Sequence, residues 1–264
     1  MNVDEKMPSL HELELFDACL TLGRGVYSPV SEWITVDNVL GMMDRYHIKE
    51  ALVHDLHARL IYPREKGNRD LLRRIRGIDR LHPVWVIEPD LNQKKDGAAR
   101  TVEEMLESGV KAARLPMNRV PPMIWVWKEL CRVLEEHAVP CFLDFGDTST
   151  RGSLDDADVN GLREICLAHP RLPLILSHVM GGLGIHPALT HLIREVPNLY
   201  IDVTGILEYW REVARDVGPE RVLFATGAPF TDPGILVSDI QYAVDFTPAE
   251  KKRMAGDNLR TLLE

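Results

Sequence analysis

Short apolar segments alternate with amphipathic segments along the whole chain. The apolar segments are rich in Val, Ile, Leu and Phe, which is typical of parallel strands that are buried on both faces. We therefore predict eight strands, at Leu13–Ala18, Glu50–Asp55, Leu81–Ile87, Lys111–Leu115, Pro140–Phe145, Leu172–Ser177, Leu199–Val203 and Arg221–Ala225.

The segments between these strands have the periodicity of helices. Val36, Val39 and Met43 form one apolar stripe, and Thr35 stands where an N-cap is expected. The run from Thr247 to Glu250 has the pattern of a capping box with Pro in the first turn. Further helices are predicted around residues 102–106, 125–137, 162–168, 187–196 and 207–217.

Repeated strand-then-helix units predict an α/β protein, a single-domain (β/α)8 TIM barrel over residues 13–264 after an N-terminal lead-in at residues 1–12. A doubly wound open sheet is the competing fold, but Leu22-Gly23-Arg24-Gly25 matches the dinucleotide fingerprint G-x-G-x-x-G poorly. The polar, acidic segment at residues 148–158 is predicted to be a loop at the edge of a site.

The amino-acid composition argues against some classes of binding partner. The net charge of −9 argues against nucleic acid and anionic membranes, which both attract basic surfaces. The four cysteines form no C-x-x-C pair and the N-terminus is not signal-like, so we expect a reduced, cytoplasmic setting. No apolar run approaches the roughly 20 residues that span a bilayer.

Polar residues gather at the ends of the predicted strands. In a TIM barrel the carboxyl ends of the strands meet at one mouth, where catalytic groups lie. We therefore expect a binding site for a small molecule among these residues. They are Cys19, Thr21, His54, Asp55, His57, Glu88, Arg114, Asp144, Asp147, Ser177, His178, Asp202, Thr204 and Thr226.

Five segments carry a resemblance to a known family. Phe16–Gly23 resembles a first-strand D-x-H-x-H-x-G motif, Leu174–Gly182 a sixth-strand H-x-G-G region, and Asn198–Thr204 a seventh strand. Arg221–Phe230 resembles R-x-x-F-G-S-D-x-P, and Gly256–Leu263 resembles a closing G-x-N-A-x-x-L helix. In this order and spacing they resemble the amidohydrolase superfamily, in the branch of aromatic-acid decarboxylases and lactone hydrolases.

The departures from the family pattern concern its metal ligands. The resemblance places the two first-strand histidines at Cys19 and Thr21, and the fifth-strand histidine at Asp144. The eighth-strand aspartate falls on Gly227, and only the sixth-strand histidine is kept, as His178. We expect a degenerate metal site, no metal ligands and no cofactor. The alternative is one divalent ion, zinc, at Cys19, Asp144 and His178, because zinc accepts S, O and N ligands.

The resemblance implies a hydrolase or decarboxylase of a small carboxylated or cyclic organic substrate. His178 would be the general acid/base, and Asp144 would orient it or act as a second base. Arg114 would hold a substrate carboxylate, to which its guanidinium is suited. The residues predicted to bind the substrate are Cys19, Thr21, His54, Arg114, Asp202 and Thr226.

Other interpretations of these residues stay open. The barrel would persist as a non-catalytic binding or assembly module if its chemistry had been lost with the metal, since fold alone does not fix function. Asp144 would then form a structural ion pair, and Cys19 would be a small buried apolar residue. Related barrels often pair, so a homodimer is also an expectation.

Overall fold

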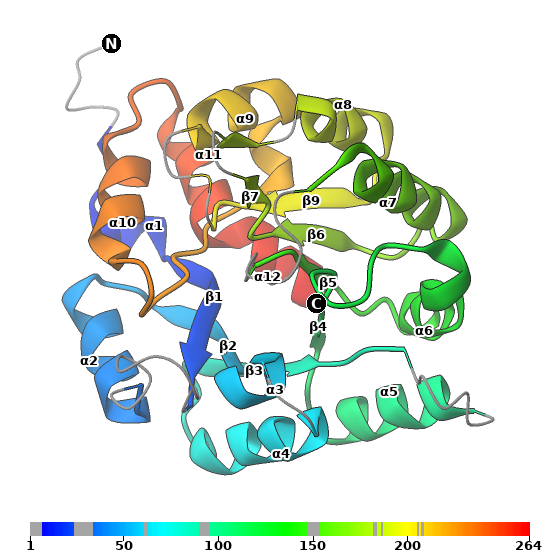
Figure 1. The fold of residues 1–264 in the computed structure, drawn as a ribbon. Helices are drawn as coiled ribbons and strands as arrows, with labels where there is room; N and C mark the ends of the chain where they lie inside the picture. The colour runs from blue at the N-terminus through cyan, green and yellow to red at the C-terminus, as the bar shows by residue number, and fades with distance from the viewer. Residues whose placement is uncertain are drawn as a thin grey trace.

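Eight parallel strands form the centre of the molecule (Figure 1). The computed structural model describes residues 7–23, 34–60, 63–89, 96–146, 154–181, 184–185, 187–204, 206 and 209–264. Each central strand pairs with the one before it, and a small antiparallel hairpin, β7 with β8, intervenes between β6 and β9. The central strands are β1 (Phe16–Leu22), β2 (Glu50–Asp55), β3 (Leu81–Val86), β4 (Ala112–Leu115), β5 (Cys141–Asp144), β6 (Leu174–Ser177), β9 (Leu199–Asp202) and β10 (Val222–Leu223). The hairpin is β7 (Met180–Gly181) and β8 (Gly184–Ile185).

The two ends of the sheet are joined by backbone hydrogen bonds. These bonds connect β1 with the segment that follows β10. The amide of Ala18 donates to the carbonyl of Phe224 at 2.9 Å, and the amide of Gly227 donates to the carbonyl of Cys19 at 3.1 Å. Because all eight strands are parallel and alternate with helices, the fold is the predicted (β/α)8 TIM barrel.

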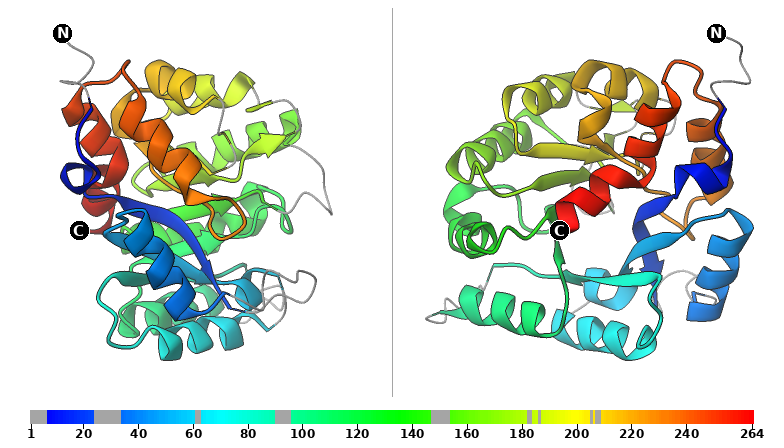
Figure 2. Two further views of the ribbon diagram at one scale, coloured as in Figure 1. Left: turned by 90° about the vertical axis from the view of Figure 1, so that its left-hand side faces the viewer. Right: turned by 180° about the vertical axis from the view of Figure 1, so that it is seen from behind.

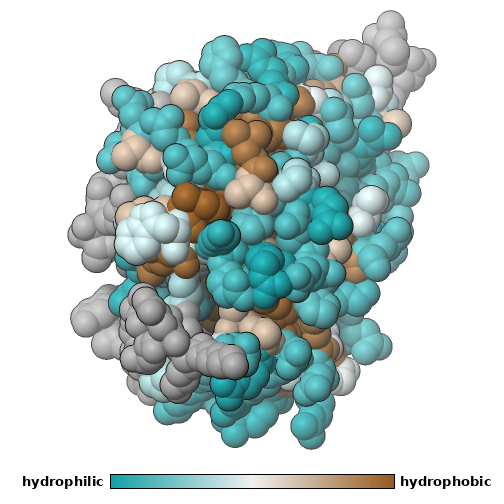
Figure 3. All heavy atoms as spheres, turned by 90° about the vertical axis from the view of Figure 1, so that its right-hand side faces the viewer, coloured by the Kyte–Doolittle hydropathy of each residue, from teal (hydrophilic) through white to brown (hydrophobic). Residues whose placement is uncertain are grey.

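Helices surround the strands on the outside (Figures 1 and 2). Their outer surface is largely hydrophilic, as the face over α5, α6 and α7 shows (Figure 3). Helix α6 illustrates why: Trp127, Leu130 and Leu134 point into the core, whereas Glu129 and Arg132 are exposed. The surrounding helices are α2 (Val36–Arg45), α3 (Leu56–Leu60), α4 (Arg64–Arg74), α5 (Gly97–Glu107), α6 (Ile124–Glu136), α7 (Asp156–Ala168), α8 (Pro187–Glu195), α9 (Trp210–Val217) and α10 (Pro233–Tyr242).

The interior of the barrel is a packed apolar layer. Helix α12 (Asn258–Leu263) lies across the amino ends of the strands, next to the short α11 (Pro248–Lys252) and the π-helical turn 253–257 (Figure 2). Leu259 of α12 packs against the apolar side chains inside the barrel, so α12 covers the amino ends of the strands. In a TIM barrel the site lies at the opposite, carboxyl ends. The strand residues of the inner cluster are Phe16, Ala18, Cys19, Leu52, Val84, Ala112, Phe142, Ile175 and Leu223, and Ala225, just after β10, joins them.

The structure moves several predicted boundaries. Leu13 belongs to a short helix, α1 (Leu10–Leu13), which enters the predicted lead-in and begins with a capping box at Ser9. The first strand starts at Phe16 instead. Leu13 is buried because it packs on the core from α1, and it does not belong to the sheet. Of the predicted loop 148–158, residues 148–153 lie outside the described part, and α7 begins at Asp156 with a capping box at Asp155.

Other expectations for the helices are confirmed. The side chain of Thr35 caps α2, and Thr247 and Glu250 form the capping box of α11. Helices α3, α4 and α10 were not predicted. Among the described residues, no helix is both long and apolar enough to cross a bilayer.

Candidate active site at the carboxyl ends of the strands

A ring of polar side chains lies directly above the apolar layer inside the barrel. Side chains alternate along a strand, so the residue two positions after an inner apolar residue faces the same interior. On six strands that residue is polar and buried. The pairs are Cys19 and Thr21, Leu52 and His54, Ala112 and Arg114, Phe142 and Asp144, Ile175 and Ser177, and Tyr200 and Asp202.

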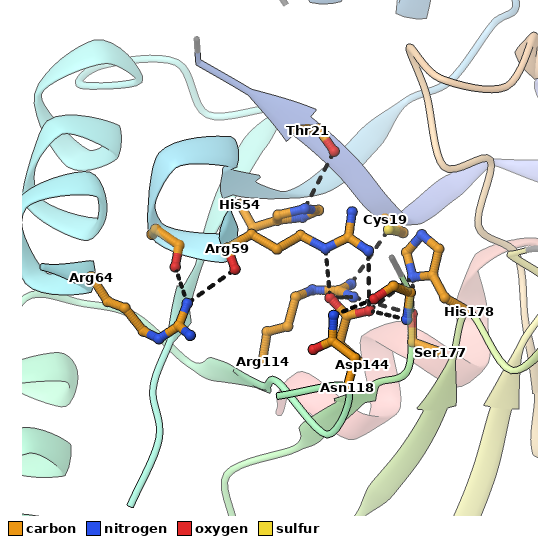
Figure 4. A network of polar contacts seen from close by, with 12 residues as sticks. Cys19, Thr21, His54, Arg59, Arg64, Arg114, Asn118, Asp144, Ser177 and His178 are labelled. Carbon is orange, nitrogen blue, oxygen red and sulfur yellow. Dashed lines mark hydrogen bonds and ion pairs between the residues drawn. The ribbon is translucent and has the colours of Figure 1, made fainter. Parts of the chain in front are cut away.

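Asp144 is the centre of the contacts in this ring (Figure 4). Its Oδ2 accepts a hydrogen bond from Nε of Arg59 at 2.7 Å and lies 3.3 Å from Nη1 of Arg114. Its Oδ1 accepts from Nη2 of Arg59 at 3.2 Å and from the amide of Gly146 at 2.9 Å. Burial alone would raise the pKa of Asp144. The charges of Arg59 and Arg114, and of His178 at the acidic pH where Asp144 titrates, outweigh burial and hold that pKa well below its usual value. Asp144 is therefore a carboxylate at neutral pH.

His178 lies beside Asp144 at the end of β6. Its Nδ1 is 3.3 Å from Oδ1 of Asp144 and 3.2 Å from Oγ of Ser177, and 21% of its side chain is exposed. Burial and then the charge of Arg59 lower the pKa of His178, so the neutral imidazole prevails at pH 7. Its φ of 55° lies in the left-handed region, which is strained for a residue with a Cβ.

Arg114 lies beneath Asp144 and is almost completely buried. Its Nη1 donates to Oγ of Ser177 at 3.2 Å, and its Nη2 lies 3.4 Å from Sγ of Cys19. The guanidinium also lies over the ring of Phe142, 5.3 Å from its centre. Burial raises the pKa of the Cys19 thiol to about 12, so Cys19 is protonated at neutral pH.

Thr21 and His54 form a second contact on the β1–β2 side of the mouth. Oγ1 of Thr21 lies 3.3 Å from Nε2 of His54, and both side chains are buried. Burial, with the nearby charges of Arg114 and Arg59, lowers the pKa of His54 well below its usual value. This side of the mouth therefore offers uncharged hydrogen-bonding groups.

Thr226 and Asp202 are held by their neighbours in the barrel wall. The amide of Thr226 donates to Oδ1 of Asp17 at 2.9 Å and its hydroxyl donates to Oδ2, which ties the segment after β10 to β1. Oδ1 of Asp202 accepts from the amide of Thr204 at 2.9 Å, and burial raises the pKa of Asp202. Thr226 thus helps to close the barrel, while Asp202 belongs to the polar ring.

The comparison with protein families identifies the group to which this arrangement belongs. Residues 46–264 match the family described as Amidohydrolase, which is most of the chain. The chain belongs to the amidohydrolase family. No curated protein matches it.

Solved structures share the fold of this amidohydrolase-family chain. A 5-carboxyvanillate decarboxylase from Sphingomonas paucimobilis has a TM-score of 0.73 at 12% identity, with 95% of this chain and 99% of that chain covered. An uncharacterised TIM-barrel protein from Bordetella bronchiseptica has a TM-score of 0.71 at 16% identity, covering 94% and 98%. A dihydroxybenzoic acid decarboxylase from Polaromonas sp. JS666, with bound manganese and the inhibitor 2-nitroresorcinol, has a TM-score of 0.68 at 14% identity, covering 94% and 96%.

The contacts of Asp144 and Cys19 bear on metal binding at this mouth. Among the described residues, no three His, Cys, Asp or Glu side chains are grouped so as to hold one. Asp144 already accepts from two guanidinium groups, and the Cys19 thiol with its pKa of about 12 faces Arg114, whereas zinc binds the thiolate. In this structure Cys19 and Asp144, two of the three residues of the alternative zinc site with His178, are thus engaged with arginine side chains.

Arg59 is the site residue that the sequence did not reveal. It follows β2 in helix α3, outside any strand, and its guanidinium crosses the mouth to reach Asp144 on β5. Three other residues named at strand ends lie elsewhere: Asp55 accepts from the amide of Ala58, Glu88 pairs with Arg64, and His57 is part of α3. The only signal in the sequence was the presence of one arginine in the segment 55–60. A single arginine in such a segment is usually exposed to solvent.

Proposed function

We propose that this protein is an enzyme that acts on a small carboxylated or cyclic organic molecule, as a hydrolase or a decarboxylase. The observation that carries the proposal is the contact of 3.3 Å between His178 and the carboxylate of Asp144 at the mouth of an amidohydrolase-family barrel. An imidazole held by a carboxylate at the catalytic end of a TIM barrel is an arrangement suited to proton transfer.

His178 would be the general acid/base. Its Nδ1 faces Asp144 and Ser177, and among the described residues its Nε2 has no partner, which leaves Nε2 to exchange a proton with the substrate. In a hydrolysis Nε2 would take a proton from the attacking water as its oxygen bonds to the substrate carbon, and would return it to the leaving group. In a decarboxylation Nε2 of the neutral His178 would first take up a proton from solvent. The ring carbon would then take this proton as its bond to the carboxylate carbon breaks and CO2 leaves, which returns His178 to its neutral form.

The charges at the mouth favour an anionic substrate. Arg59 and Arg114 are the cations at the mouth, and both contact Asp144, while the pKa shifts keep His178, His54 and Cys19 uncharged at neutral pH. Asp202 is the other acidic group of the ring, and burial raises its pKa. A substrate carboxylate would bind to these guanidinium groups, which hold carboxylates through paired hydrogen bonds. Thr21, His54 and Cys19 would supply uncharged contacts, and Asp202 and Thr226 would support them from the wall.

We further propose that the family's metal site is degenerate here, with guanidinium groups around Asp144 where other members hold a metal. The contacts of Arg59 and Arg114 with Asp144 support this. The ion pairs of Asp144 and the burial of Cys19 fit both the enzyme and the non-catalytic alternative, so they do not support the latter. The carboxyl ends of the strands are polar and not plugged by apolar side chains, which favours the enzyme. A homodimer and a cytoplasmic location stay predictions from the sequence.

Turnover assays with small ring acids test the proposal. Purified protein is incubated with 2,6-dihydroxybenzoate, 5-carboxyvanillate and a panel of aromatic lactones, and released CO2 or acid is measured. We expect one class to react, and His178→Asn to abolish turnover while His191→Asn, at an exposed histidine of α8, leaves it unchanged. If the whole panel neither reacts nor binds, or if His178→Asn retains full activity, the proposal is wrong.

A further inference from the structure

Arg59 reaches the site from a helix and not from a barrel strand. It belongs to α3, the five-residue helix Leu56–Leu60 that follows β2. Its Nε and Nη2 both bind Asp144, while its third nitrogen, Nη1, is turned away from that carboxylate and has no partner among the described residues (Figure 4). Only 1% of the Arg114 side chain is exposed against 10% for Arg59, so Arg59 is the guanidinium nearer to an entering ligand.

Helix α3 is too short to hold this geometry by itself. One turn of helix fixes several backbone dihedrals for very few hydrogen bonds, so an isolated segment of five residues does not stay helical. The direction in which α3 presents Arg59 must therefore come from contacts at its two ends.

A buried arginine holds the carboxyl end of α3. Nη1 of Arg64 donates to the carbonyl of Ala58 at 2.5 Å and to the carbonyl of Arg59 itself at 3.0 Å (Figure 4). These are carbonyls that the helix end leaves without partners of its own. Nε of Arg64 lies 2.9 Å from Oε2 of Glu88, just after β3, and only 4% and 11% of the two side chains are exposed. The pair thus joins the backbone of Arg59 to the barrel wall.

Asp55 holds the amino end of the same helix. Its Oδ1 accepts from the amide of Ala58 at 2.9 Å, and its Oδ2 accepts from Nη1 of Arg74 on α4 at 2.9 Å. Helix α4 also approaches closely at Gly67, where a Cβ would lie only 2.5 Å from the amide nitrogen of Ala58. The amino end is therefore fixed independently. At the carboxyl end, Nη1 of Arg119 also donates to the carbonyl of Leu60 at 3.0 Å, but Arg64 is the residue that binds the carbonyl of Arg59 itself.

We propose that Arg64 and Glu88 are positioning residues that set Arg59 against Asp144, and that Arg59 so held binds the substrate carboxylate. The second half rests on the proposed function, whereas the first half concerns only the geometry of this chain. Without the charge of Glu88, Arg64 keeps its helix-end contacts but loses its ion pair with the wall, so the carboxyl end of α3 gains freedom even though Arg119 still binds Leu60. Arg59 would then leave Asp144 for part of the time.

The positioning half is tested by the NMR signal of the Arg59 Nε–H group, assigned by its loss in Arg59→Lys. In the native protein we expect a signal protected from exchange with water, because this N–H donates to Asp144 at 2.7 Å. In Glu88→Gln it should exchange at least ten times faster, and Glu88→Asp should restore part of the protection. The matched control is Glu104→Gln, which breaks the exposed pair of Glu104 with Arg69 and should change nothing.

Equal protection of Arg59 in the native protein, Glu88→Gln and Glu104→Gln would overturn the positioning role, whatever the enzyme does. Arg64→Met is a second variant with the same expectation as Glu88→Gln, and it decides the question if Glu88→Gln does not fold.

The ligand-binding half uses 4-fluorobenzoate as the probe, followed by fluorine NMR. We expect Arg59→Gln to weaken binding at least tenfold, Glu88→Gln to weaken it several-fold, and Glu104→Gln to leave it unchanged. Native affinity in Arg59→Gln, or no binding to the native protein, would overturn this half while the exchange data still decide the positioning role. Failure of the proposed function itself would be seen separately, as absent turnover with every ring acid and lactone.

Discussion

Nδ1 of His178 lies 3.3 Å from Oδ1 of Asp144, although the two residues belong to different strands of the barrel. β5 and β6 are paired so that Asp144 stands opposite Ser177, one residue before His178. The left-handed backbone of His178 turns the chain there, at the edge of the mouth. This turn directs the imidazole of His178 back toward Asp144.

The lowered pKa of His178 predicts how stability depends on pH. Burial and Arg59 hold the pKa in the folded protein below 6.5, so the unfolded chain takes up the proton first as pH falls. The native protein should therefore lose stability relative to His178→Asn between pH 7 and pH 5. Urea denaturation at several pH values measures this, and an unchanged difference between the two proteins would contradict it.

Asp17 should titrate near neutral pH. Burial raises its pKa to about 7, against the hydrogen bonds from Thr226 and Cys19 that lower it. Because the folded protein binds this proton more tightly than the unfolded chain, the contribution of Asp17 to stability should fall as pH rises from about 4 to about 7. Carbon-13 NMR of the Asp17 carboxyl measures the midpoint directly. A midpoint near 4 would show that the hydrogen bonds outweigh burial.

The two arginines on Asp144 should differ in their effect on stability. Arg114→Gln removes a fully buried cation from Asp144, Ser177 and Cys19, and breaking a buried ion pair costs about 3–5 kcal/mol. Arg59→Gln removes a partly exposed partner, and we expect a loss of about 2 kcal/mol, the range of a hydrogen bond to a charged group. Urea denaturation of both variants compares them. A larger loss for Arg59→Gln would contradict the assignment of Arg114 to the buried support.

Gly227 should not tolerate the aspartate that the family pattern places there. Its φ is +69°, and an added Cβ would lie 2.9 Å from Cγ2 of Thr204. We expect Gly227→Asp to reduce the free energy of unfolding by about 1–3 kcal/mol. Gly77→Asp is the matched control, because Gly77 has a φ of +77° with open space around it. Equal losses in the two variants would mean that backbone strain alone acts at Gly227.

The barrel could be predicted because its strands are buried on both faces. Such strands appear in the sequence as continuous apolar runs, and all eight lie where those runs were found. The first boundary was misplaced because Leu13 and Leu15 are as apolar as strand residues, although Leu13 packs on the core from helix α1. Helix α4 was missed because its exposed side carries many charged residues, which obscure the stripe that contains Leu71.

The site could be predicted only where strand position decides it. Asp144, Arg114 and Ser177 end consecutive strands, so their convergence follows from the topology. Arg59 could not be found in this way, because its contact depends on a side chain that reaches across the mouth from α3. A buried carboxylate such as Asp144 needs cationic partners. Arg114, at the end of β4, already supplied one, so there was no reason in the sequence to look for a second.

The metal content of the purified protein tests the central claim most directly. We propose that Arg59 and Arg114, by binding Asp144, leave the mouth unsuited to a divalent ion. After equilibration with Mn²⁺ or Zn²⁺ and removal of free metal, elemental analysis should find far less than one equivalent per chain, with the same residual amount in Asp144→Ala. One equivalent of bound metal in the native protein that Asp144→Ala loses would contradict the account.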